Sequence, residues 1–360
     1  MELQLHFDEA DWERIERDYS AWWAHELPRP IVQIGGWDGT RLENPLPSFM
    51  SNVPFDVSAE EIVERAAESF RHRYYYGDDF PHWWINFGPG MVAGLLGAVV
   101  HSVEETVWFE PPGDTSIEGL SFAYQPDNPW WQRILAITRA GAQAFGQMVQ
   151  VSHTDLGGNL DILASFTTTQ QLLTDLYDHP ETVERLALQI TELWKRYYDE
   201  LDAIIYPACR GRVPWTPIWS TGRCYMMQCD FAYMISPEMF DRFVMPDLVA
   251  LCDHLAAGFY HLDGQGQIPH LDSLLSIERL RGIQWVPGDG SPTAEHWLDL
   301  YQRIRNGGKL CQFFCTPEAA LQIVSAIGGK DIMFSVSGSM DAEQARAFLD
   351  EMRQRDVWKY

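Results

Sequence analysis

The chain has 360 residues, of which 46% are hydrophobic and 21% are charged, and its formal net charge is −25. This composition is typical of a globular protein with a large core, and a chain of this length can form one large domain or two. The negative charge disfavours a surface that tracks phosphate groups, so we expect no nucleic-acid partner. The sequence contains no apolar run of about 18 residues, so we expect no membrane span.

The six cysteines indicate free thiols, because none of them falls in a CxxC pair. The first residues show neither the basic end nor the apolar run of a signal peptide. We therefore expect a cytoplasmic protein.

Helical and strand patterns begin at the N-terminus. Apolar residues recur at spacings of three and four from Glu9 to about His25, which predicts a helix in an N-terminal extension over residues 1–29. A first strand is predicted at residues 31–35, and further strands are predicted near residues 83 and 147–152.

From Gly258 onward a strand followed by a helix start repeats four times, at intervals of roughly 25 residues. Such alternation predicts a parallel sheet with right-handed crossovers. With the earlier strands the count approaches eight, which favours a single (β/α)₈ TIM barrel domain over residues 1–360; a doubly wound open sheet is the alternative. The four strands are Phe259–Leu262, Ile283–Val286, Leu310–Phe314 and Ile332–Val336.

A long irregular stretch, Pro207–Cys229, precedes these units and is rich in aromatic residues. Long loops in compact domains are usually functional, so we expect this one to fold over the C-terminal mouth of the barrel. The aromatic side chains could equally be ordinary core. We predict an apolar cavity with Arg223 as an anion contact, lined by Trp215, Trp219, Tyr225 and Trp285, and we predict His153 as a further substrate contact.

His261 and Asp263 lie two residues apart at the end of a predicted strand, so their side chains share one face. Barrel enzymes place catalytic groups at this end of their strands. The pair could bind a metal with Cys315, His153 or water as a third ligand. Without a metal, Asp263 could orient His261 as a general base. The pair could also simply satisfy each other in a polar core layer.

Several segments together are similar to the uroporphyrinogen decarboxylase superfamily. The most specific is the block from Gln228 to Phe240 with Pro246, which includes Asp230, and the order of the weaker segments supports it. These are Phe87-Gly88-Pro89-Gly90, the segment from Gly158 to Glu181, and His261-Leu262-Asp263-Gly264. The resemblance covers about residues 30–349, implies a (β/α)₈ barrel, and makes Asp230 a third predicted catalytic residue.

The chain departs from true uroporphyrinogen decarboxylases. Their N-terminal arginine-rich motif is replaced by residues 35–39, and their catalytic aspartate is missing from the segment that begins at Asn86. These departures disfavour porphyrin decarboxylation. We keep Asn86 as a predicted substrate contact.

The resemblance is closer to the corrinoid-dependent methyltransferases of the same superfamily. It implies methyl transfer between a small substrate or thiol and a corrinoid carried by a partner protein. The family's zinc ligands match His261 and Asp263, the latter in place of a cysteine, and Cys315 is the predicted third ligand. A lyase or decarboxylase acting on a small aromatic or carboxylic acid, and a non-catalytic binding protein, are the alternatives. The oligomeric state stays open.

Overall fold

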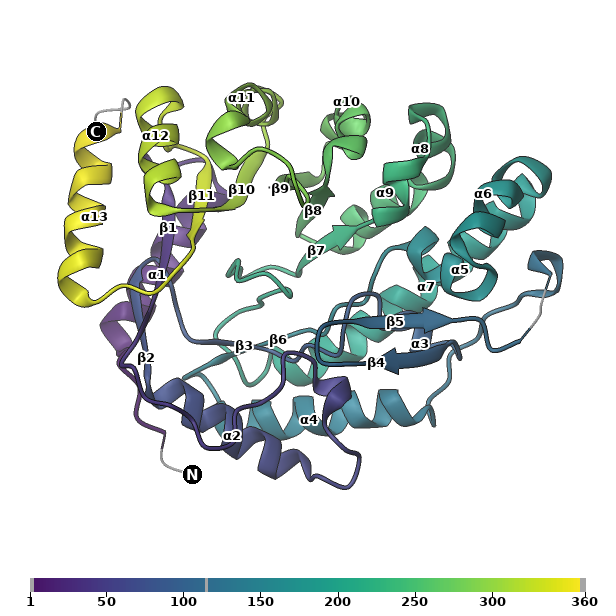
Figure 1. Cartoon of the computed structure of the whole chain (residues 1–360), viewed down its shortest axis with the longest axis horizontal. Helices are drawn as coiled ribbons and strands as arrows, with labels where there is room; N and C mark the ends of the chain where they lie inside the picture. The colour runs from purple at the N-terminus through teal and green to yellow at the C-terminus, as the bar shows by residue number, and fades with distance from the viewer. Residues whose placement is uncertain (1–2, 114–115, 357–360) are drawn as a thin grey trace.

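The computed structural model describes residues 3–113 and 116–356 and has an α/β architecture around a curved, mostly parallel sheet (Figure 1). Seven strands form the main sheet, and every neighbouring pair except β1–β2 is parallel. In spatial order the strands are β2 (Arg73–Gly77), β1 (Ile31–Trp37), β11 (Ile332–Val336), β10 (Leu310–Cys315), β9 (Leu280–Val286), β8 (Ala257–Asp263) and β7 (Cys224–Gln228).

Four more strands lie outside the main sheet. β3 (His82–Trp84) pairs in parallel with β6 (Gln150–Ser152), and β4 (Val99–Ser102) forms an antiparallel pair with β5 (Val107–Glu110). The predicted strand positions and strand–helix alternation are confirmed. Within the described residues, however, no strand pairing joins β3 or β6 to the main sheet, so a barrel closed by hydrogen bonds is not observed.

The helices follow the strands in the order expected for crossover connections, and those from α10 to α13 stand side by side in Figure 1. Their bounds are α1 Glu9–Trp23, α2 Ala59–Arg71, α3 Val92–Leu95, α4 Pro129–Phe145, α5 Asn159–Thr167, α6 Thr169–Asp178, α7 Pro180–Ile205, α8 Pro237–Phe243, α9 Met245–His254, α10 Leu271–Ser276, α11 Leu298–Asn306, α12 Pro317–Ile327 and α13 Ala342–Arg355.

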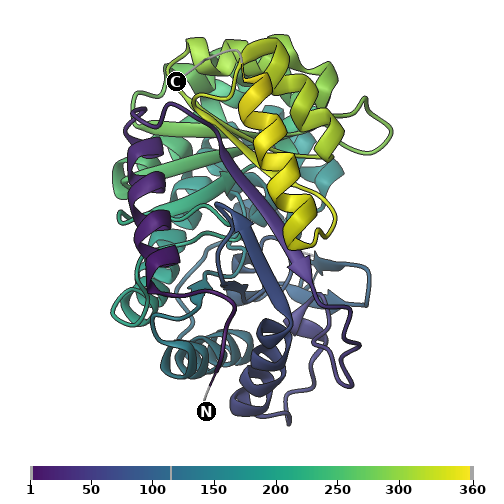
Figure 2. The ribbon, with the colours of Figure 1, turned by 90° about the vertical axis from the view of Figure 1, so that its left-hand side faces the viewer.

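Helix α1 covers the N-terminal ends of the strands, as Figure 2 shows. Its apolar stripe, which includes Trp12, Tyr19 and Trp22, packs in one buried cluster with Phe259 of β8 and Met333 of β11. Phe259 and Met333 therefore lie on the same face of the main sheet, and we call this face the inner face. Because side chains alternate along a strand, every second residue of each strand lies on it. The predicted N-terminal helix is confirmed, and it seals one end of this face.

The aromatic-rich loop takes a path that the sequence did not indicate. We call residues 206–223, which connect α7 to β7, the inserted segment. It lies against the inner face: Trp219 belongs to the cluster beneath α1, and the Gln33 amide donates to the Pro217 carbonyl at 2.6 Å. The prediction that this loop folds over the C-terminal mouth is therefore wrong.

The inserted segment also lies between two strands that do not pair with each other. The Gly211 N–H donates to Gln150 of β6 at 3.1 Å, and the Trp215 indole donates to the Met226 carbonyl of β7 at 2.9 Å. The segment thus fills the gap between β6 and β7, where hydrogen bonding between barrel strands would otherwise be required.

All six cysteines are buried and free, as the sequence predicted. Among the described residues, no helix combines the length and apolar character needed to cross a membrane.

Candidate functional site

Asp230, His261 and Asp263 come together at the C-terminal ends of β7 and β8. One ligand atom from each side chain lies within 4.8 Å of the other two. The His261 Nε2 and Asp263 Oδ2 atoms are 3.9 Å apart, which is too long for a hydrogen bond. The two side chains therefore do not simply satisfy each other, and all three groups face a shared space.

The local sequence explains this convergence. β7 and β8 are adjacent and parallel, with Gln228 opposite His261, so the residues that follow each strand meet at one edge of the sheet. Asp230 begins a short 3₁₀ helix, Asp230–Met234, and the Asp161 carboxylate of α5 accepts hydrogen bonds from its first two N–H groups at 3.0 and 2.7 Å. This capping holds the Asp230 backbone in place.

Two further carboxylates lie behind the three. Burial raises the pKa of Asp155 to about 6, and burial together with the nearby Asp230 charge raises the pKa of Asp161 to about 7. Although Asp230 is solvent-accessible, partial burial of its carboxylate also raises its pKa. The mutual repulsion of these acidic groups favours either a bound cation or a shared proton.

Asp155 is held by the backbone of two glycine-containing loops. Its Oδ1 atom accepts from Gly157 N at 2.8 Å and from Gly90 N at 3.3 Å. Gly157 has a φ of +82°, and a Cβ there would lie 2.5 Å from the Gly90 Cα. Only glycine allows the two loops to approach so closely.

Aromatic side chains form the wall beside His261. The Trp215 ring lies 5.2 Å from the His261 ring in an edge-on arrangement, and 6.0 Å from the Trp84 ring of β3. The buried Trp84 Nε1 and Ser152 Oγ atoms have no protein hydrogen-bond partner among the described residues. Trp215 thus lies beside His261, and its predicted contact with a substrate stays a prediction.

Cys315 is not part of this group. Its side chain alternates with Gln312 and Phe314 of β10 and lies in the core outside the inner face. Burial raises its pKa to about 12, which disfavours the thiolate that a metal requires. The structure thus contradicts Cys315 as the third ligand, and Asp230 is the third member of the candidate group.

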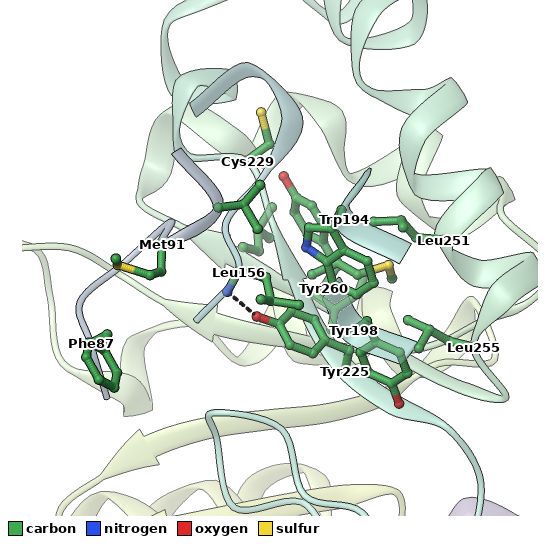
Figure 3. Packing of buried hydrophobic residues seen from close by; sticks show 14 of the residues in the cluster. Phe87, Met91, Leu156, Trp194, Tyr198, Tyr225, Cys229, Leu251, Leu255 and Tyr260 are labelled. Atoms are coloured by element: carbon green, nitrogen blue, oxygen red, sulfur yellow. Dashed lines mark hydrogen bonds between the residues drawn. The ribbon is translucent and has the colours of Figure 1, made fainter. Parts of the chain in front are cut away.

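His153 and Tyr225 also lie outside the inner face, because each is packed against α7. The His153 ring stacks on Tyr198 at 4.6 Å, and burial lowers its pKa to about 4. Tyr225 packs edge-on against Trp194 and Tyr198, which stack on each other at 5.5 Å, and its hydroxyl accepts from Leu156 N at 2.7 Å (Figure 3). Neither residue contacts the site, so their predicted substrate contacts are contradicted.

Three other predicted contacts are placed elsewhere. Trp219 is buried beneath α1 at the opposite end of the strands. Trp285 alternates with the inward-facing Gln284 and packs on Trp297 at 4.9 Å. Arg223 directly precedes β7, at the strand end remote from the site, and pairs with Asp199 at 2.5 Å. The anion role of Arg223 is therefore wrong.

Asn86 follows β3 at the correct end of the strands, but its amide is occupied locally. Its Nδ2 donates to the Ser48 carbonyl at 3.0 Å, and its Oδ1 accepts from Gly88 N at 3.0 Å. Asn86 therefore shapes the loop, and a substrate contact stays a prediction.

Sequence reasoning missed Gln284, whose Oε1 atom accepts a hydrogen bond from His261 Nδ1. It also missed Phe314, which shares the inner side of β10 with Gln312 and has 49% of its surface exposed. The sequence held a usable signal for Gln284, because a polar residue in the middle of an otherwise apolar strand is unusual.

A cavity of about 530 Å³ lies away from these residues, between β2 and α13. Among its arginines, Arg29 is already paired with both Asp18 and Asp78 at 2.7 Å. None of the three site residues lines it, and we assign it no functional role.

Comparisons with known proteins place the fold. No family model matches the sequence, and no curated protein matches it either. Among solved structures, the chain is similar to a methyltransferase from Methanosarcina mazei, with a TM-score of 0.53 and 11% sequence identity. The match covers 76% of this chain and 80% of that protein. At this identity the similarity shows a shared α/β fold.

Proposed function

We propose that this protein is a methyltransferase whose reaction takes place at Asp230, His261 and Asp263. The observation that carries the proposal is the convergence of these three side chains at the C-terminal ends of adjacent parallel strands. The fold similarity to a methyltransferase and the sequence resemblance to the corrinoid-dependent branch support it.

The three side chains fit a zinc ion. Zinc accepts imidazole nitrogen and carboxylate oxygen, and a catalytic site keeps one position for water or substrate. His261 Nδ1 is hydrogen-bonded to Gln284, so Nε2 is the ring nitrogen that faces the carboxylates. When bound, zinc would act as a Lewis acid and lower the pKa of an acceptor thiol.

The protein's own residues would orient the reactants. Trp215 contacts the His261 ring edge-on and limits its rotation. Burial disfavours the charged forms of Asp155 and Asp161, and a cation at the three side chains would offset this by attracting their negative charge.

We further propose a corrinoid protein as the partner in methyl transfer. Large apolar side chains are exposed near the site: Tyr233 and Met234 follow Asp230, and Phe314 lies on the inner side of β10, with exposed fractions of 55%, 46% and 49%. A protein that carries its methyl group on a bulky cofactor requires an accessible, partly apolar entrance of this kind.

A metal-free lyase or decarboxylase is the second candidate. Burial raises the pKa of Asp230, which brings its carboxyl group closer to protonation, and the Nε2 atom of His261 lies in the same group. Such a pair can donate a proton to one substrate atom and accept a proton from another.

Metal analysis of the purified protein separates the two candidates. We expect one zinc per chain, and His261→Ala and Asp263→Ala should each weaken Zn²⁺ binding at least about tenfold. Both variants should also abolish methyl transfer from methylcobalamin to 2-mercaptoethanol. Asp289→Ala, which changes an exposed aspartate in the loop after β9, is the matched control and should retain both properties.

The outcomes are distinct. The metal-free candidate would be supported if the wild-type protein binds no zinc and both variants lose decarboxylation or lyase turnover. If both variants fold and behave as the wild type does, the three residues are structural and the proposed site is wrong.

A further inference from the structure

We propose that a directional chain of hydrogen bonds across the inner face holds His261 in the tautomer with its proton on Nδ1. The chain runs through Gln284, Gln312, Ser335 and Gln33, one residue on each of β9, β10, β11 and β1. The use of the resulting Nε2 lone pair for a metal or a proton rests on the proposed function, whereas the tautomer itself does not.

The direction of the chain is set at its far end by Gln33. The Gln33 side chain lies 2.6 Å from the Pro217 carbonyl oxygen, which can only accept a hydrogen bond. It also lies 2.9 Å from the Tyr19 hydroxyl, which in turn donates to the Asp78 carbonyl at 3.3 Å. Both contacts require the NH₂ group of Gln33 on this side, so its Oε1 atom faces Ser335.

Each following bond is then determined by the one before it. Gln33 Oε1 accepts from the Ser335 hydroxyl at 3.1 Å, so the Ser335 oxygen is left to accept from Gln312 Nε2 at 3.0 Å. Gln312 therefore presents Oε1 to Gln284, whose Nε2 donates to it. A primary amide that donates with its nitrogen presents its oxygen on the other side.

The last bond of the chain acts on the candidate site. Gln284 presents Oε1 to His261 Nδ1, which must carry a hydrogen to donate. Neutral imidazole has one N–H, so Nε2 keeps its lone pair toward Asp230 and Asp263. Gln284 and Gln312 are completely buried, so water does not compete for these bonds.

Two other groups near the chain do not reverse it. The Thr216 hydroxyl accepts from Gln284 Nε2 at 3.2 Å, and because a hydroxyl can either donate or accept, it is compatible with this amide orientation and does not oppose it. The Trp215 ring contacts His261 edge-on without bonding to Nδ1. The four chain residues are thus positioning residues for His261, because they act on the site only through its ring.

The test reads the tautomer directly by NMR. Protein labelled with ring-¹⁵N histidine is stripped of metal, and spectra are recorded over a pH series until the His261 ring shifts no longer change with pH, so that they report the tautomer. A His261→Gln spectrum identifies the His261 signals among the 11 histidines. We expect Nδ1 to be protonated and Nε2 to be unprotonated in the wild type.

Two variants break the chain without touching His261. Ser335→Ala and Gln312→Met should each allow the remaining amides to turn, so that a substantial fraction of His261 carries its proton on Nε2. Zn²⁺ affinity should fall roughly tenfold, as is common when a partner that orients a ligand is lost. Gln150→Met is the matched control, since Gln150 is a buried glutamine of β6 outside the chain.

The result separates this inference from the proposed function. A wild-type ring protonated on Nε2, or a tautomer unchanged in both chain variants, would overturn the inference even if the enzyme transfers methyl groups. The expected tautomer shift with no zinc binding would support the inference and contradict the metal site. An equal shift in Gln150→Met would mean that general loosening, and not the chain, controls the ring.

Discussion

At the scale of single residues, strand alternation decides which side chains reach the site. His261 and Asp263 face inward. Trp285 and Cys315 each directly follow an inward-facing residue, so their side chains point to the other face of the sheet and pack in the core.

Burial also acts on single residues, because it raises the pKa of carboxyl groups far from the site. Asp247 of α9 is buried against Thr191 of α7, and its pKa is raised to about 6.

The raised pKa of Asp247 predicts a pH-dependent stability. Its usual pKa is 3.8, so between about pH 4 and pH 6 the folded state binds more protons than the unfolded state, and stability falls as the pH rises. Asp247→Asn keeps an acceptor for Thr191 and removes the buried charge. We expect the variant to be more stable than the wild type at pH 7, by about 1–3 kcal/mol, with little difference at pH 4.

Urea unfolding of both proteins at the two pH values measures this effect. Asp241→Asn on α8 changes an exposed aspartate and should alter stability little at either pH. A variant that is less stable than the wild type at pH 7 would show that the Thr191 contact outweighs the burial of the charge.

At the scale of elements, the inserted segment takes the place of strand pairing between β6 and β7. Its backbone and side chains bond to both strands, through Gly211 to Gln150 and through Trp215 to Met226. The same segment contacts the hydrogen-bonded chain at Thr216 and Pro217. The inserted segment therefore supports the edge of the sheet, and it also sets the direction of the hydrogen bonds in the chain beneath the site.

The hydrogen bond of Trp215 to β7 gives a prediction for this segment. Trp215→Phe keeps an aromatic ring beside His261 but leaves the Met226 carbonyl without its donor. We expect a loss of about 1–3 kcal/mol in the free energy of unfolding, the usual cost of an unsatisfied buried acceptor. Denaturant unfolding measures it.

Trp108→Phe provides the comparison, because Trp108 has 41% of its surface exposed. It should change stability by less than about 0.5 kcal/mol. Equal effects of the two substitutions would mean that the Trp215 bond contributes nothing specific.

At the scale of the whole molecule, α1 and the main sheet share one core at the N-terminal end of the strands. Trp22 is fully buried there and stacks on Phe259 of β8 at 6.0 Å. Gly282 of β9 makes room for Phe259, since a Cβ at this position would lie 2.0 Å from its ring. The packing joins segments more than 230 residues apart in the sequence, so we expect α1 and the sheet to unfold together.

Trp22→Ala tests this cooperativity. Loss of a fully buried tryptophan typically costs about 3–5 kcal/mol, and the cost should appear in the unfolding of the sheet as well as of α1. Hydrogen exchange of backbone amides in α1 and β8 should therefore accelerate together. Faster exchange confined to α1 would show that the helix is an independent attachment, and Trp108→Ala serves as the exposed control.

The sequence by itself determined the order of strands and helices, the N-terminal helix and the pairing of His261 with Asp263 on one face. These features depend on local periodicity and on helix capping, which neighbouring residues specify. The tertiary structure alone decided that the inserted segment enters the inner face, that Cys315 lies outside the group formed by Asp230, His261 and Asp263, and that the buried glutamines form a directional chain. These features depend on contacts between distant segments: the Pro217 carbonyl lies 184 residues from Gln33 in the sequence, and no local pattern specifies which strand face a distant loop will meet.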